Sequence, residues 1–125
     1  MNLLLTALPL DVGSYRGTPT AAPYALRGYL GTDPELSARV QVQVGVLEPS
    51  RSDEELVDEL SRAPAGAVGL TCYVWNVERS VRLLEALRVK RPDLLLLLGG
   101  PDVAPRARRV LQDHPAIAHV SYPGL

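Results

Sequence analysis

The 125-residue sequence predicts an α/β protein in which a parallel β-sheet has helices on both faces. Three short apolar runs, residues 3–8, 67–70 and 94–98, are typical of strands buried on both faces of a parallel sheet. Amphipathic segments separate these runs, so strand and helix patterns alternate along the chain. Strict alternation requires crossover connections and therefore parallel strands.

The first strand run leads into a long loop and then a helix. Residues 9–18 contain two glycines, a proline and Asp11, and a loop of this length between strand and helix is often a binding loop. A helix is expected over residues 19–30, with Gly31 as its stop. The apolar residues that we expect on its buried face are Ala22, Ala25, Leu26 and Tyr29.

Residues 40–46 alternate valine with glutamine or glycine, which predicts a strand with one covered face at a sheet edge. Ser52 followed by Glu55 is a capping box, so a helix should start there and stop by Pro64. The third strand run ends in Thr71 and Cys72 and is followed by two aromatic residues. Asn76 is a favoured N-cap residue and should open a helix that extends to about residue 90.

The fourth strand run, residues 94–98, is expected to be fully buried and is broken by the sequence Gly-Gly-Pro-Asp at 99–102. A short helix over 104–113 and a fifth strand over 117–121 complete the alternation. Because the alternating pattern of the second strand indicates a sheet edge, the sequence best fits the strand order 2-1-3-4-5. This order is that of the flavodoxin-like (Rossmann-like), doubly wound folds.

No helix pattern follows the predicted fifth strand, so the last helix of this fold is missing from the sequence. We therefore expect residues 1–125 to form a single domain at the N-terminal part of a longer protein. Without that helix, Ile117, Ala118 and Val120 should be uncovered, which predicts that the chain associates into a homodimer or is only marginally stable alone.

Composition excludes several classes of function. A net charge of −1 with 46% hydrophobic residues predicts a compact cytoplasmic protein that binds neither nucleic acid nor a membrane surface. One cysteine rules out an internal disulfide and a cysteine-based metal cluster. His114 and His119 have no second ligand at metal spacing, so no metal-ligating residue is predicted.

The carboxyl ends of parallel strands form the edge at which such folds bind ligands. Small residues after the third and fourth strands should meet at this edge and let a ligand approach the backbone. No catalytic residue is predicted there. We expect Gly100→Val to block a ligand while leaving the fold intact.

Two motifs in this sequence resemble the vitamin B12-binding domain at the N-terminus of many radical SAM enzymes. They are Thr71-Cys72-Tyr73-Val74-Trp75-Asn76 and, after a helix and a strand, Gly99-Gly100-Pro101-Asp102. Residues 23–30 are similar to the first helix of that family, and the resemblance covers essentially the whole chain.

The resemblance implies that the corrin ring of cobalamin lies across the carboxyl edge of the sheet. The contacts that it implies are Asp11, Gly13, Ser14, Thr71, Cys72, Tyr73, Val74, Trp75, Gly99, Gly100, Pro101 and Asp102. The implied partner is a radical SAM catalytic domain, in cis or in trans, such as a methyltransferase. That domain, and not this chain, would hold the iron–sulfur cluster and S-adenosylmethionine.

The sequence departs from the wider cobalamin families at two places. Where mutases and methionine synthase carry Asp-x-His-x-x-Gly, this chain has Gly13 two residues after Asp11, so no protein histidine is expected on cobalt. Where the radical SAM family usually carries Arg-Gly-Glu-Gly-Glu, this chain has Ser-Tyr-Pro-Gly-Leu at 121–125.

Two other functions fit the same fold. A degenerate copy of the cobalamin fold would bind no cofactor and act as an interaction module. A flavin or nucleotide binder would hold phosphate in the loop after the first strand, where Ser14, Gly17 and Thr18 are candidates.

Overall fold

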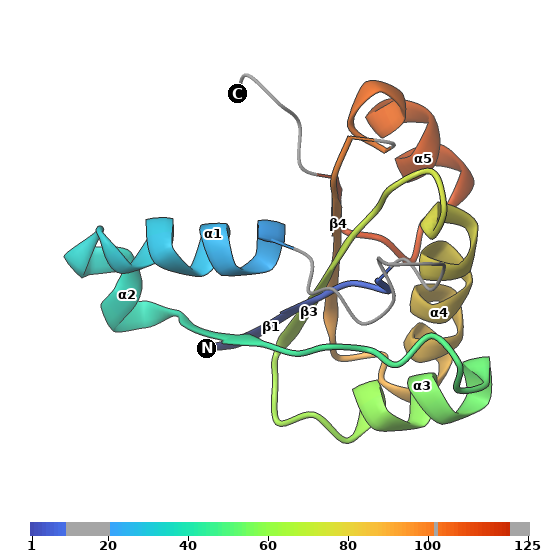
Figure 1. Cartoon of the computed structure of the whole chain (residues 1–125), viewed down its shortest axis with the longest axis horizontal. Coiled ribbons are helices and arrows are strands. Elements are labelled where there is room, and N and C mark those ends of the chain that lie inside the picture. Colours follow the sequence, from blue (N-terminus) through green and yellow to red (C-terminus); the bar gives the residue numbers. More distant parts are fainter. Residues whose placement is uncertain (10–20, 102, 121–125) are drawn as a thin grey trace.

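The sheet has five parallel strands in the order β2-β1-β3-β4-β5, which confirms the predicted flavodoxin-like fold. The structure is a computed structural model that describes residues 1–9, 21–101 and 103–120. Figure 1 shows the arrangement of its elements. In chain order they are β1 (Asn2–Thr6), α1 (Ala21–Gly31), α2 (Pro34–Arg39), β2 (Gln41–Val44), α3 (Asp53–Ser61), β3 (Ala67–Thr71), α4 (Val77–Lys90), β4 (Leu95–Gly99), the 3₁₀ helix η2 (Ala104–Arg106), α5 (Ala107–Asp113) and β5 (His119–Val120).

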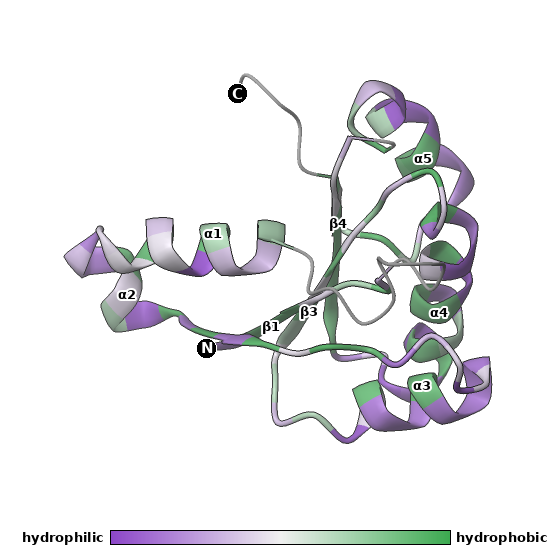
Figure 2. Ribbon diagram, in the orientation of Figure 1, coloured by the Kyte–Doolittle hydropathy of each residue, from purple (hydrophilic) through white to green (hydrophobic). Residues whose placement is uncertain are grey.

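The hydrophobic core lies between the sheet and helices α3, α4 and α5. Leu4, Val68 and Leu96 are partners across β1, β3 and β4, so their side chains share one face of the sheet. The leucines of α3 and α4 pack on this face and are fully buried: Leu56, Leu60, Leu83, Leu84 and Leu87. In Figure 2 the hydrophobic sides of α3 and α4 face the sheet, as the amphipathic patterns predict.

The opposite face of the sheet is only partly covered. Leu3, Val42 and Leu95 belong to this face, because Leu3 is the partner of Val42 on β2 and is aligned with Leu95 on β4 across the strand between them. Figure 1 shows α3, α4 and α5 on one side, whereas α1 and α2 lie on the other and extend away from the sheet. Leu95 is 43% exposed, so the expectation that the whole fourth strand is buried is wrong for this residue. Strand residues alternate between faces, and one of the two faces lacks close helical cover.

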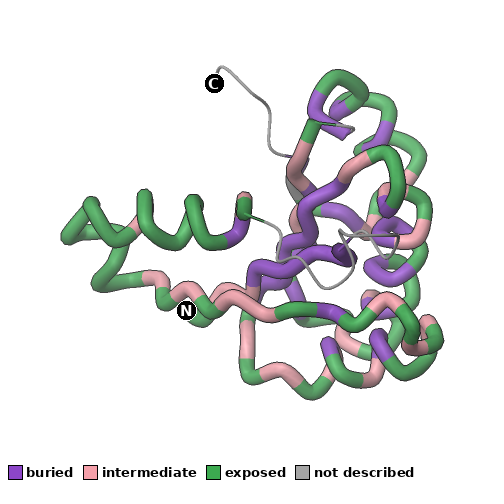
Figure 3. Tube along the Cα trace, viewed as in Figure 1, coloured by how far each residue is buried: buried purple, intermediate pink, exposed green. Residues whose placement is uncertain are grey.

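Helix α1 forms near the predicted position and ends at Gly31, but its apolar side chains are not buried. Tyr29 is 78% exposed and Leu26 is 50% exposed, while Pro23 is the buried residue of this helix. Figure 3 shows α1 and α2 as mostly exposed. Among the described elements, the main contacts of α1 are with α2 and β2. Its apolar face therefore has little to contact.

Helix α2 was not predicted, although the sequence carries its start signal. Asp33 is the N-cap, and its carboxylate accepts hydrogen bonds from the backbone N–H groups of Glu35 and Leu36. Pro34 follows at the first helical position, where its missing N–H has no consequence.

The fifth strand is better covered than the sequence indicates. Ile117 and Val120 are both buried in the core beside α5, so the expectation that these two residues lack cover is wrong. Ala118 is exposed. Among the described residues, no helix combines the length and the apolarity needed to cross a membrane.

Arg79 on α4 fixes the start of α3. Its guanidinium donates to the carbonyl oxygens of Pro49 at 2.8 Å and Arg51 at 2.5 Å, and to the carboxylate of Asp53 at 2.7 Å. The hydrogen bond from Arg79 lowers the pKa of Asp53 below its ordinary value of 3.8, with Arg82 adding to the effect and partial desolvation opposing it. The capping box between Ser52 and Glu55 is present as predicted.

We predict that Arg79→Lys lowers the free energy of unfolding by about 1–2 kcal/mol at pH 7, because lysine cannot reach three acceptors at once. The share due to Asp53 stays well below about 1 kcal/mol, because that carboxylate is partly exposed. A lowered carboxyl pKa stabilises the fold above the unfolded pKa and ceases to do so as the pH falls through the folded pKa. Urea unfolding at pH 7 and pH 3 should therefore show a smaller difference between the two proteins at pH 3. Arg108→Lys on exposed α5 is the control, and an equal loss there would contradict the prediction.

Candidate functional site

The carboxyl ends of β1, β3 and β4 meet at one edge of the sheet. Thr71 and Gly99 are partners across β3 and β4, and the backbone N–H of Cys72 donates to the carbonyl oxygen of Gly99 at 2.6 Å. The structure therefore brings together the described parts of the two predicted motifs. Asp11, Gly13, Ser14 and Asp102 lie outside the described residues.

Asn76 joins the ends of β1 and β3. Its side-chain amide nitrogen donates to the carbonyl oxygens of Leu8 at 2.9 Å and Thr71 at 3.2 Å. Its side-chain oxygen accepts from the backbone N–H of Tyr73 at 2.7 Å. Asn76 is the N-cap residue of α4, as predicted, but its side chain makes no capping hydrogen bond to that helix, because the amide turns back towards the strands. A buried amide with all these partners sets the positions of the three segments relative to one another.

Tyr73 and Trp75 stack on each other at the edge. Their ring centroids are 4.6 Å apart and the ring planes differ by 5°. The indole N–H of Trp75 donates to the carbonyl oxygen of Leu8 at 3.3 Å, which holds the indole beside the end of β1. Even so, Trp75 is 47% exposed, and Val74, which separates the two aromatic residues in the sequence, is 81% exposed. We call residues 73–75 the edge patch.

Gly100 is required by the backbone itself. Its φ of +107° lies in a region that residues with a side chain rarely adopt. A Cβ atom there would lie 2.3 Å from the carbonyl oxygen and 2.7 Å from the nitrogen of Cys72. The expectation that Gly100→Val would spare the fold is therefore wrong.

The remaining predicted contacts differ in what they can offer a ligand. Thr71 and Cys72 are buried beneath the edge, so their side chains are shielded. Gly99 is half-buried and Pro101 is exposed. The predicted contact set did not include Asn76 or Leu8, which organise the edge. The signal for Asn76 was its position directly before a helix, three residues after Tyr73, where a side-chain amide can close the turn.

An open parallel sheet of order 2-1-3-4-5, with an aromatic patch and a glycine at its carboxyl edge, defines a flavodoxin-like ligand-binding domain. The B12 binding domain family matches residues 36–123. Since this match spans more than half of the chain, the protein belongs to the B12 binding domain family.

Two curated relatives have similar sequences. The 2-(S-pantetheinyl)-carbapenam-3-carboxylate methyltransferase of Streptantibioticus cattleyicolor is 30% identical over 97 residues. The cobalamin-dependent radical SAM methyltransferase TokK of Streptomyces tokunonensis is 27% identical over 92 residues. Each match covers 74% of this chain but 13% of the relative, so the chain corresponds to a small part of these longer proteins.

Solved structures support the fold. A cobalamin-binding protein from Desulfitobacterium hafniense has a TM-score of 0.56 at 18% identity, covering 96% of this chain and 52% of that one. A CheY-like protein from Pseudomonas aeruginosa has a TM-score of 0.62 at 20% identity, covering 99% and 89%. At these identities the likeness establishes the architecture alone.

We predict that Gly100→Ala lowers the free energy of unfolding by at least about 2 kcal/mol, because the added Cβ meets backbone atoms that cannot rotate away. Gly28→Ala on α1 is the matched control. A Cβ at Gly28 has nothing within 4 Å, and alanine favours a helix. Urea unfolding followed by circular dichroism measures both variants. Equal stability of the two variants would show that Gly100 is not constrained by the fold.

Proposed function

We propose that this domain binds cobalamin across the carboxyl edge of its sheet and serves a radical SAM enzyme such as a methyltransferase. The observation that carries the proposal is the edge patch, in which an indole and a valine remain exposed beside strand ends where ligands of this fold lie. Membership of the B12 binding domain family supports the choice of cobalamin.

The edge patch fits a large flat ligand. The rings of Tyr73 and Trp75 stack face to face, so the pair can offer a ligand the flat outer face of a ring, and aromatic side chains pack well on the face of a macrocycle. Covering apolar surface gains roughly 25 cal/mol per Å², so a corrin ring over Val74 and Trp75 would be held by burial. Gly99 would allow the ring to approach the sheet. Bound cobalamin would supply the alkyl-transfer chemistry.

Polar groups at the edge already form hydrogen bonds within the domain. The carbonyl oxygen of Leu8 accepts from both Asn76 and Trp75. The edge patch is thus held rigidly before any ligand arrives, which lowers the entropic cost of binding. The proposed contacts in this part of the chain are Tyr73, Val74, Trp75, Gly99, Gly100 and Pro101, and Asp11, Gly13, Ser14 and Asp102 complete the set. Thr71 and Cys72 are buried beneath these residues and would support them from below.

We propose that no histidine of this chain binds cobalt. His114 follows the C-terminal end of α5, and its ring nitrogen Nδ1 pairs with the carboxylate of Glu85. The crossover helices run antiparallel to the strands, so this end of α5 faces the opposite edge of the sheet. Gly13 stands where other cobalamin families carry a histidine.

The catalytic partner is a separate proposal about the longer protein. The names of the two relatives include a methyltransferase and a cobalamin-dependent radical SAM methyltransferase. We propose that a radical SAM domain, in cis or in trans, holds the iron–sulfur cluster and S-adenosylmethionine. The partly exposed sheet face with Leu95 is the surface that we propose for association, either with that domain or in a homodimer.

We predict that Trp75→Ser weakens the binding of hydroxocobalamin about tenfold or more, because it removes half of the stacked pair. Val89→Ser is the control, because Val89 is an apolar residue that is 83% exposed on α4. Binding is measured by titration calorimetry and by visible absorbance. A red protein supports the proposal, a yellow protein as purified supports a flavin binder, and the absence of binding supports an interaction module.

We predict that the double variant His114→Ala, His119→Ala leaves the visible spectrum of the bound corrin unchanged. Loss of an axial imidazole changes the electronic absorption of cobalamin, so the spectrum reports directly on ligation. Circular dichroism of the variant provides the check on folding. A clear shift of the visible bands in a folded variant would show that one of these residues ligates cobalt.

A further inference from the structure

Strand β2 is the outermost strand on its side of the sheet. Among the described residues, no further strand lies beyond it. Gln41 and Gly45 donate their backbone N–H groups to carbonyl oxygens within residues 1–5, at 2.9 and 3.0 Å, so both face β1. Backbone groups alternate in direction along a strand, so those of Val42 and Val44 face outwards. These two residues each present a donor and an acceptor to another extended chain.

The outer edge of β2 lacks the features by which proteins usually protect such a strand. Residues 40–46 contain no charged residue and no proline, and the register of β2 with β1 is continuous. Charges, proline and bulges are the usual protection, because an exposed edge otherwise pairs with other chains. The net charge of the sequence is only −1, so repulsion between two copies is weak.

The sequence of this strand is nearly the same in both directions about Gln43. Valine stands one and three residues away on each side, and only Gln41 and Gly45 differ between the two halves. An antiparallel pair aligns one strand with the reverse of the other. A strand of this kind therefore matches a second copy of itself, as a two-fold symmetric contact requires.

Antiparallel pairing centred on Gln43 uses the outward-facing backbone groups. Val42 of one copy lies opposite Val44 of the other, and the same pair recurs across the two-fold axis. Each pair exchanges both of its N–H···O bonds, which gives about four hydrogen bonds in all. The two copies of Gln43 then form a pair without backbone bonds, with their Cα atoms about 4.5 Å apart.

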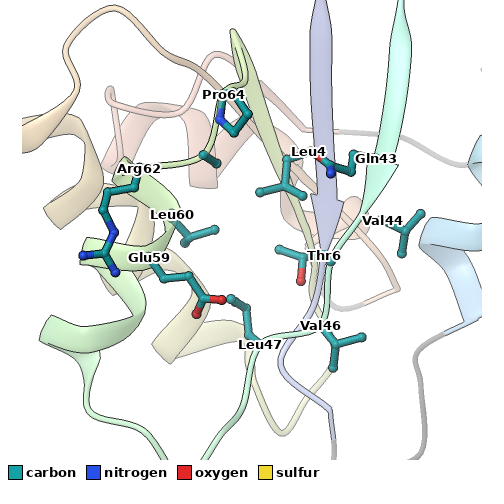
Figure 4. A pocket seen from close by; sticks show the side chains of 12 residues that line it. Leu4, Thr6, Gln43, Val44, Val46, Leu47, Glu59, Leu60, Arg62 and Pro64 are labelled. Carbon is teal, nitrogen blue, oxygen red and sulfur yellow. The ribbon is translucent and has the colours of Figure 1, made fainter.

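The side chains of the two copies also match on each face of the sheet. Val42 is the partner of Leu3 in β1, so the valines lie on the partly exposed face. Gln43 is the partner of Leu4, on the face that the helices cover. Figure 4 shows the side chains of Gln43 and Val44 on opposite sides of β2. Pairing thus places valine beside valine on one face and amide beside amide on the other.

Helix α1 adds a second surface in need of a partner beside the same strand. It packs on β2, on the side of the sheet away from α3, α4 and α5 (Figure 1). Its Tyr24 is 41% exposed, its Leu26 50% and its Tyr29 78%. A two-fold axis at the outer edge of β2 brings the α1 helices of both copies to one face of the joined sheet. One partner can therefore cover both the strand edge and the apolar side of α1.

We propose that a second copy of this chain pairs with the outer edge of β2, in an antiparallel contact centred on Gln43. The contact is small, so the dimer is weak, with a dissociation constant of about 10–100 μM. The proposal rests on the strand edge. It depends neither on cobalamin nor on the sheet face that carries Leu95.

Sedimentation velocity of the full chain over a concentration series measures the association. We expect monomer at about 2 μM and mostly dimer at several hundred μM, as the dissociation constant requires. Amide hydrogen exchange over the same series identifies the surface. The N–H groups of Val42 and Val44 should exchange about tenfold more slowly at the highest concentration, while those of exposed α2 should not change.

Two charge variants test the register. Gln43→Lys and Gln43→Glu each place like charges opposite one another at the two-fold axis, so each should weaken the dimer about tenfold. An equimolar mixture of the two variants should associate at least as tightly as the native chain, because the charges are then opposite. Gln112→Lys and Gln112→Glu on exposed α5 are the matched controls and should change nothing, alone or mixed.

Four results would overturn the proposal. One is a chain that stays monomeric throughout the series. Another is a dimer that neither Gln43 variant weakens, and a third is a mixture of these variants that does not associate. The fourth is a dimer that Leu95→Ser abolishes, which would place the contact on the sheet face instead. Circular dichroism of each variant ensures that a loss of association is measured on folded protein.

Discussion

The carboxyl edge of this domain depends on one buried side-chain amide, that of Asn76. It is 3% exposed and links the carbonyl oxygens of Leu8 and Thr71 to the turn before α4. Without it, the carbonyl oxygen of Leu8 would keep only the indole N–H of Trp75, and that of Thr71 would lose this donor; leaving a buried carbonyl group unpaired costs about 1–3 kcal/mol. The register of β1 and β3 sets where the two strands end, and Asn76 fixes how the following chain leaves them.

The edge patch is a consequence of this constraint. Asn76 closes the turn of residues 73–76, in which the rings of Tyr73 and Trp75 stack on each other and Trp75 stays 47% exposed. Gly100 has the matching role on β4, where its positive φ lets the chain pass the backbone of Cys72 at close range. The fold therefore places a stacked, partly exposed aromatic pair above buried polar contacts.

The two faces of the sheet differ in what they are free to do. One face is closed by α3, α4 and α5. The other face carries Leu95 and is left partly exposed by α1 and α2. The chain spans about 13% of the length of its curated relatives. In those longer proteins, the remaining residues can supply surfaces that pack on such a face.

Much of the fold follows from the sequence alone. The alternation of strand and helix patterns, the edge position of β2 and the capping box at Ser52 were all predicted and are present. These features are local, since hydrophobic periodicity and capping depend on neighbours within a few residues. The convergence of the motifs after β3 and β4 was also predicted, because the topology of a parallel sheet places the carboxyl ends of its strands at one edge.

Other features were decided by contacts between distant segments. The sequence marks Asn76 as a helix cap, but its amide binds Leu8, 68 residues away in the chain. The pattern of α1 indicates a buried side, yet Tyr29 is exposed because burial depends on where the helix docks. The sequence predicted that Gly100 leaves room for a ligand, but backbone atoms of Cys72 already occupy the position that a Cβ atom would take. Periodicity states which residues can be buried or paired, and only the tertiary structure supplies the partner.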